Sequence, residues 1–68
     1  MRLNSKTKEQ LEVGDVLRLG DGVTVRIGYV LRCGRAMYIT GRWYDGSPLY
    51  TSPVTFWYGA EILKGGEQ

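Results

Sequence analysis

The stretch VTVRIGYVLR, residues 23–32, decides the fold class of this chain, because a large apolar residue occupies every second position. This apolar set comprises Val23, Val25, Ile27, Tyr29 and Leu31. A period of two is typical of a β-strand with one buried face, so we expect the set to face a core. Gly28, in the middle of the stretch, predicts a bend or β-bulge of the kind that a tightly curled barrel requires.

Glycine-containing turns separate this strand from its neighbours in sequence. Gly20-Asp21-Gly22 is a strong turn signal, and we expect an earlier strand over residues 15–19 before it. The turn Cys33-Gly34-Arg35 leads into a later strand over residues 36–44. The set of that later strand that we expect to face the core is Met37, Ile39, Gly41 and Trp43.

Shorter elements are expected at both ends of the chain. Thr7 followed three residues later by Gln10 predicts one helical turn, which would place Leu11 on the core. Asp45-Gly46 predicts a hairpin turn, and Pro53 predicts that the following strand lies at a sheet edge. The last expected elements are a resumed strand over 54–57, a helical turn over 58–61 and a brief strand at Ile62-Leu63.

Short strands with turns every eight to twelve residues indicate an all-β fold. Because closure into a barrel leaves few exposed strand edges, we expect a single small SH3-like barrel of about five short antiparallel strands. The barrel would span residues 11–64, after a flexible polar segment over 1–10 and before a polar tail over 65–68.

Composition limits the ways in which a domain of 68 residues can be stabilised and what it can bind. With one cysteine, Cys33, and no histidine, we expect no internal disulfide, no metal and no cofactor. Self-association as a dimer or tetramer is the remaining route to stability. The first ten residues hold no apolar signal segment, and no stretch approaches the roughly 20 apolar residues that span a bilayer, so a cytoplasmic protein without membrane contact is expected.

The absence of histidine also excludes the common nucleophilic triads, so the sequence favours binding over catalysis. Between residues 16 and 44 there are five arginines and a single acid, Asp21. If the strands at 23–32 and 36–44 are adjacent, Arg26, Arg32 and Arg42 share an outward face with tyrosines. The candidate surface for nucleic acid or another partner comprises Arg26, Arg32, Arg35, Tyr38, Arg42 and Tyr44.

Arginines interleaved with aromatics suit single-stranded nucleic acid, which is slightly favoured, and they also suit protein partners. A protein-interaction or inhibitor module of phage or mobile-element origin is therefore an alternative. So is a purely structural role, in which these side chains only pair across strands and keep the sheet soluble.

A second candidate surface surrounds Phe56-Trp57-Tyr58. Three consecutive large aromatics cannot all face one small core, so at least one is expected at the surface, as a contact patch or a subunit interface.

Four stretches of the chain form a recognisable set: Val13-Gly14-Asp15-Val16-Leu17-Arg18-Leu19, Val23-Thr24-Val25, Arg42-Trp43-Tyr44-Asp45-Gly46 and Ala60-Glu61-Ile62-Leu63. Together they resemble the YodC-type family of small bacterial proteins. The resemblance covers about 50 residues, by the count of matching elements, and implies an SH3-like barrel without implying an activity. Gly20-Asp21-Gly22 replaces the family's Ser-Gly-Gly-Pro turn, and the loop after Gly46 is longer.

The segment from Val54 to Leu63 is similar to the end of the type B, plasmid-borne dihydrofolate reductases. That resemblance implies a tetramer around a central pore, whose Val-Gln-Ile-Tyr motif binds folate and NADPH. The interface or pore candidates are Val54, Thr55, Phe56, Trp57 and Tyr58. Thr55 stands in place of the motif's Gln, which removes an amide donor and acceptor, so reductase activity is not expected. A tetrameric pore protein with this architecture is a further alternative for the function.

Overall fold

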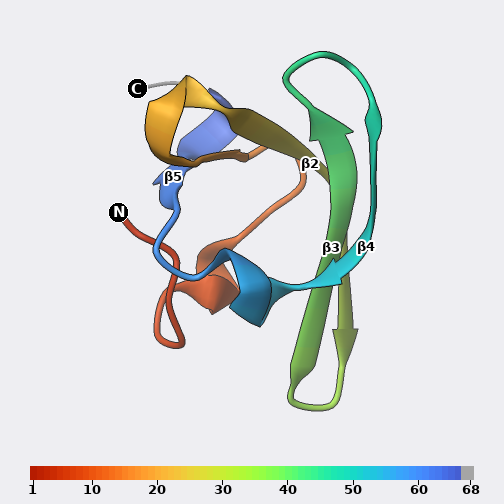
Figure 1. Cartoon of the computed structure of the whole chain (residues 1–68). Helices are drawn as coiled ribbons and strands as arrows, with labels where there is room; N and C mark the ends of the chain where they lie inside the picture. Colours follow the sequence, from red (N-terminus) through yellow and green to blue (C-terminus); the bar gives the residue numbers. More distant parts are fainter. Residues whose placement is uncertain (67–68) are drawn as a thin grey trace.

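Five antiparallel strands form one sheet in the computed structural model, which describes residues 1–66. The strands are β1 (Val16–Arg18), β2 (Thr24–Cys33), β3 (Ala36–Trp43), β4 (Pro48–Pro53) and β5 (Glu61–Leu63), in the order β4-β3-β2-β1-β5 (Figure 1). Short 3-10 helices connect or flank them: η1 (Lys8–Gln10), η2 (Gly20–Gly22), η3 (Val54–Trp57) and η4 (Lys64–Gly66). The predicted all-β class is confirmed.

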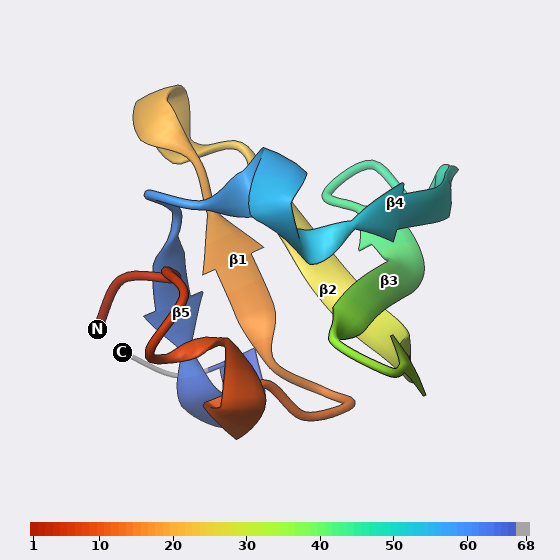
Figure 2. The same cartoon turned by 90° about the horizontal axis from the view of Figure 1, so that it is seen from below.

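The sheet curls into a small barrel-like shape. Figure 2 shows β1 and β5 on one side, β3 and β4 on the other, and β2 crossing between the two halves. The core lies inside the curl and comprises Leu3, Leu11, Leu17, Val25, Ile27, Met37, Ile39, Val54, Trp57, Ala60 and Ile62. Trp43 packs against it while partly exposed. The predicted core positions of Leu11, Met37 and Ile39 are confirmed.

A β-bulge at Gly28 bends β2, as predicted. Ile27 pairs with Gly41, but the next pair is Tyr29 with Thr40, so Gly28 has no partner on β3. The extra residue shifts the alternation by one position. Tyr29 and Leu31 are therefore 57% and 42% exposed, and the expectation that they face the core is wrong.

The segment between β4 and β5 differs from the expectation. Residues 54–57 form the 3-10 helix η3 and not a strand, while Tyr58 and Gly59 form a turn and Glu61 already begins β5. A 3-10 helix has three residues per turn, so Val54 and Trp57 lie on the same side. Both are buried in the core. Burial of these two side chains prevails over the strand propensity of the sequence VTFW.

The polar opening segment contributes a core residue that the sequence analysis did not identify. Leu3 is fully buried, its N–H donates to Ala60 O at 2.8 Å, and its carbonyl accepts from Gly59 N at 2.8 Å. Arg2 forms an isolated antiparallel bridge with Glu61. The start of the chain is thereby attached to β5. Of the predicted tail, residues 67–68 lie outside the described residues.

Within residues 1–66, no helix has the length and apolar character that crossing a membrane requires.

Candidate functional site

Two arginines face each other across neighbouring strands on the outer face of the sheet. Arg26 on β2 is the cross-strand partner of Arg42 on β3. Both are exposed, because they alternate with the buried Val25, Ile27 and the partly buried Trp43. Arg26 Nη1 donates to Gly14 O at 3.1 Å, and Arg42 Nη1 donates to Gly46 O at 2.9 Å. Each guanidinium keeps further N–H groups for a ligand.

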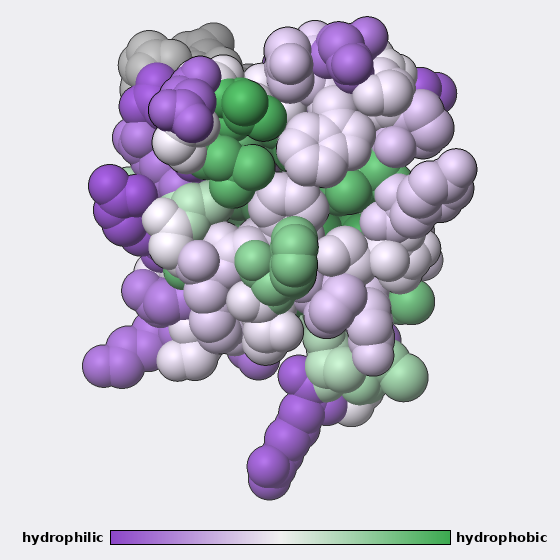
Figure 3. Space-filling model, viewed as in Figure 1, coloured by the Kyte–Doolittle hydropathy of each residue, from purple (hydrophilic) through white to green (hydrophobic). Residues whose placement is uncertain are grey.

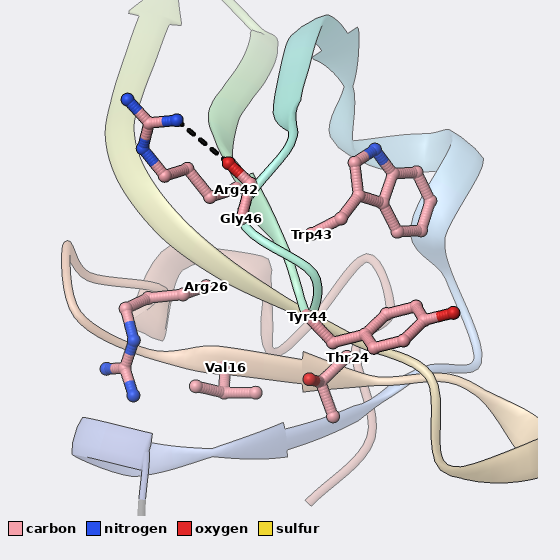
Figure 4. A pocket seen from close by; sticks show the side chains of 7 residues that line it. All are labelled: Val16, Thr24, Arg26, Arg42, Trp43, Tyr44 and Gly46. Atoms are coloured by element: carbon pink, nitrogen blue, oxygen red, sulfur yellow. Dashed lines mark hydrogen bonds between the residues drawn. The ribbon is translucent and has the colours of Figure 1, made fainter.

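The arginine pair borders a hollow of about 350 Å³ on this face (Figure 4). The other residues that line it are Val16, Thr24, Trp43, Tyr44 and Gly46. Figure 4 shows both guanidinium groups on one side of the hollow and the Tyr44 ring extending the opposite way, beside Thr24. The hollow thus combines two cations, a hydroxyl and an aromatic ring.

Within residues 1–66, two of the four arginines on strands form ion pairs with carboxylates. Arg18 donates through Nε to Glu61 Oε1 at 3.1 Å, and the hydrogen bond from Arg18 lowers the pKa of the Glu61 carboxyl. Arg32 Nε lies 3.6 Å from Glu9 Oε1. Within residues 1–66, neither Arg26 nor Arg42 forms an ion pair with a carboxylate. The hollow is therefore bordered by two positive charges that have no ion-pair partner among residues 1–66.

The structure separates the other predicted surface residues from this hollow. Arg32 pairs with the buried Met37, so it lies on the opposite face of the hairpin from Arg26, and the predicted common face is wrong for Arg32. The bulge at Gly28 is the cause. Tyr38 lies on the same face as Arg42 but near the start of β3, and Arg35 lies in the turn at that end of the β2–β3 hairpin.

Thr24 is a lining residue that the sequence analysis did not select. It belongs to the same alternating set as Arg26, two positions earlier, and the two therefore share a face. The alternation of side chains between the two strand faces is enough to predict that Thr24 lies beside Arg26.

The second candidate surface, residues 54–58, divides between core and solvent. Val54 and Trp57 are buried, and Trp57 Nε1 donates to Ser52 Oγ at 3.1 Å. Phe56 is 75% exposed and packs edge-on against Trp57, with the ring centroids 5.4 Å apart. The expectation that at least one of the three aromatics is exposed is confirmed. On the face seen in Figure 3, hydrophobic residues form separate small patches among hydrophilic ones.

Asp15 is a buried carboxylate whose hydrogen bonds are internal. It accepts from Lys64 Nζ at 2.8 Å, Gly65 N at 3.1 Å and Glu12 N at 2.9 Å. Burial alone would raise the pKa of the Asp15 carboxyl, but these three donors hold the pKa below its ordinary value. With its acceptor sites occupied in this way, Asp15 has a structural role.

Comparison of the chain with protein-family models, with curated proteins and with solved structures found no match in any of the three. The hollow and the charges around it are therefore the features of the molecule that bear on its function.

Proposed function

We propose that the protein binds nucleic acid through the outer face of the β2–β3 hairpin, around Arg26 and Arg42. The observation that carries this proposal is the direct cross-strand pairing of the two arginines, with no acidic partner for either among residues 1–66.

Like charges directly opposite each other destabilise a sheet. Of the other arginines on strands, Arg18 and Arg32 each have a carboxylate partner, so among residues 1–66 this pair differs from them. A phosphate beside the pair would turn the repulsion into two attractive, charge-assisted contacts. An anionic ligand is therefore the partner that best suits this surface.

The openness of the surface favours a polyanion over a small phosphate. The arginines lie on an exposed sheet face and not inside an enclosed cavity, so single anions would remain largely hydrated. A nucleic acid backbone supplies phosphates at regular intervals, and release of its counterions adds to affinity. The exposed Tyr44 beside the arginines suits the bases of such a ligand.

Salt titration of oligonucleotide binding tests the proposal. Fluorescence anisotropy would follow a labelled single-stranded DNA or RNA of about 15 nucleotides, and we expect affinity to fall steeply as salt rises. Arg26→Gln and Arg42→Gln should each weaken binding and reduce the slope of log K against log salt by about 0.7. Arg32→Gln is the matched control, because it removes the same charge from the opposite face.

Two results would overturn the proposal. One is the absence of oligonucleotide binding at low salt, which would leave a protein partner as the better explanation of the surface. The other is an equal loss of binding in Arg32→Gln and Arg26→Gln, which would show that net charge matters and the hollow does not.

A further inference from the structure

Tyr44 is an exposed aromatic ring without a ring partner among residues 1–66. It lies directly after β3 and is 69% exposed, whereas its neighbour Trp43 turns toward the core and packs on Trp57 with centroids 5.7 Å apart. Burial or ring packing therefore does not account for an aromatic residue at position 44. The Tyr44 ring lines an open hollow and is mostly exposed, so it is accessible to a ligand.

The backbone around Tyr44 is held by a hydrogen-bonded turn. Trp43 N donates to Ser47 O at 2.8 Å, and Gly46 N donates to Trp43 O at 2.9 Å. Ser47 N donates to the Asp45 side chain at 3.0 Å, which closes the turn from inside. Because this turn is already ordered, a ligand that stacks on Tyr44 loses little free energy in fixing the platform.

The arginines are part of the same arrangement. Arg42 Nη1 donates to Gly46 O, so the side chain that would hold a phosphate is tied to the turn that carries Tyr44. In Figure 4, the guanidinium groups and the ring lie on opposite sides of the hollow. A strand laid across the hollow would place its backbone on the arginines and an adjacent base on Tyr44.

We infer that the hollow takes single-stranded nucleic acid, with one unpaired base stacked on Tyr44 and the flanking phosphates held by Arg26 and Arg42. This inference rests on the proposed function and adds the class of nucleic acid. In a duplex the base faces are covered by their neighbours, so a ring can stack only on a base that is unpaired. Stacking accepts every base, so the binding is tolerant of sequence.

The test compares three ligands of equal length at one salt concentration: a single strand with bases, a fully abasic single strand, and a blunt duplex. The wild-type protein should bind the base-containing strand about tenfold more tightly than the abasic strand. Tyr44→Ala should lose about tenfold on the base-containing strand and be unchanged on the abasic one. Tyr44→Phe, which keeps the ring, should bind within about twofold of the wild type.

Tyr50→Ala is the matched control, because Tyr50 is 86% exposed and does not line the hollow. A thermal melt of each variant checks that it is folded. Equal binding of the base-containing and abasic strands, or tighter binding of the duplex, would overturn this inference. Loss of binding in Arg26→Gln would in those cases still support the proposed function, whereas failure of all three ligands to bind would overturn both.

Discussion

At the scale of single residues, Asp15 joins its own loop to η4 through one carboxylate that accepts three hydrogen bonds. Its donors are Glu12 N, Lys64 Nζ and Gly65 N. Asp15→Asn keeps the shape but places an amide N–H against donors, so we expect a loss of about 2 kcal/mol in the free energy of unfolding at pH 7. Urea denaturation followed by tryptophan fluorescence measures it. Asp21→Asn, in an exposed turn, is the control.

The pH dependence of that loss follows from the pKa of Asp15. An unfolded aspartate has a pKa near 4. The pKa of Asp15 in the folded protein lies below that value. The carboxylate therefore contributes its stabilisation above about pH 4 and loses it as the pH falls through the folded pKa. We expect the difference between the wild type and Asp15→Asn to shrink between pH 5 and pH 2. A difference that stays constant over that range would contradict the assignment.

Gly41 is the residue at which β2 and β3 approach most tightly. A Cβ at this position would collide with the backbone carbonyl oxygen of Arg26, which cannot move without breaking the sheet. A Cβ at Gly28 would instead lie 3.5 Å from the Gly41 Cα, an ordinary contact. We expect Gly41→Ala to lose about 3 kcal/mol or to fail to fold, and Gly28→Ala to change stability by less than about 1 kcal/mol. Equal effects in chemical denaturation would contradict this difference.

At the scale of elements, the sequence predicted the parts that depend on local alternation and turn chemistry. The strands at 24–33 and 36–43, the bulge at Gly28 and the Asp45-Gly46 turn are of this kind. Beyond the bulge, the face on which a β2 side chain lies depends on which β2 residue has no partner on β3. The pairing of the two strands determines that residue. Arg32 lies on the opposite face from the predicted one for this reason, while the predicted common face of Arg26 and Arg42 is confirmed.

The remaining differences arise where distant segments meet. η3 forms because Val54 and Trp57 are buried in the core where this segment contacts β3 and β4, which the sequence VTFW does not reveal. Leu3 is a single apolar residue in a polar segment, and its burial depends on the backbone of Gly59 and Ala60. Periodicity cannot identify a lone residue of this kind.

The opening segment is therefore expected to be part of the stable domain. Leu3→Ala removes a fully buried side chain, and we expect a loss of about 3 kcal/mol in the free energy of unfolding. For a domain of this size that is a large share of the total. Val13→Ala, at a position that is mostly exposed, should change it by less than about 0.5 kcal/mol. Denaturation curves of both variants that coincide with the wild type would show that the segment does not contribute.

At the scale of the whole molecule, the arginine pair connects stability with binding. The net charge is only +2, so most electrostatic energy arises from local arrangements. Arg18 and Arg32 attract carboxylates, whereas Arg26 and Arg42 oppose each other across two strands. If this pairing leaves a repulsion in the folded domain, a bound phosphate backbone would relieve it. A surface kept for a ligand at the expense of stability is typical of functional sites.

We expect the variant Arg42→Gln to separate the effect of this charge on folding stability from its effect on oligonucleotide binding. Removing one charge relieves the repulsion, so the variant should be about 0.5 kcal/mol more stable than the wild type at low salt. This gain should decrease when salt is raised to about 0.15 M, because the Debye length shortens to about 8 Å. Oligonucleotide affinity should fall in the same variant. Denaturation at two salt concentrations and anisotropy on the same preparations measure both quantities. A variant that is less stable at low salt would mean that the Arg42–Gly46 hydrogen bond outweighs the repulsion, and would contradict a destabilising effect of the arginine pair.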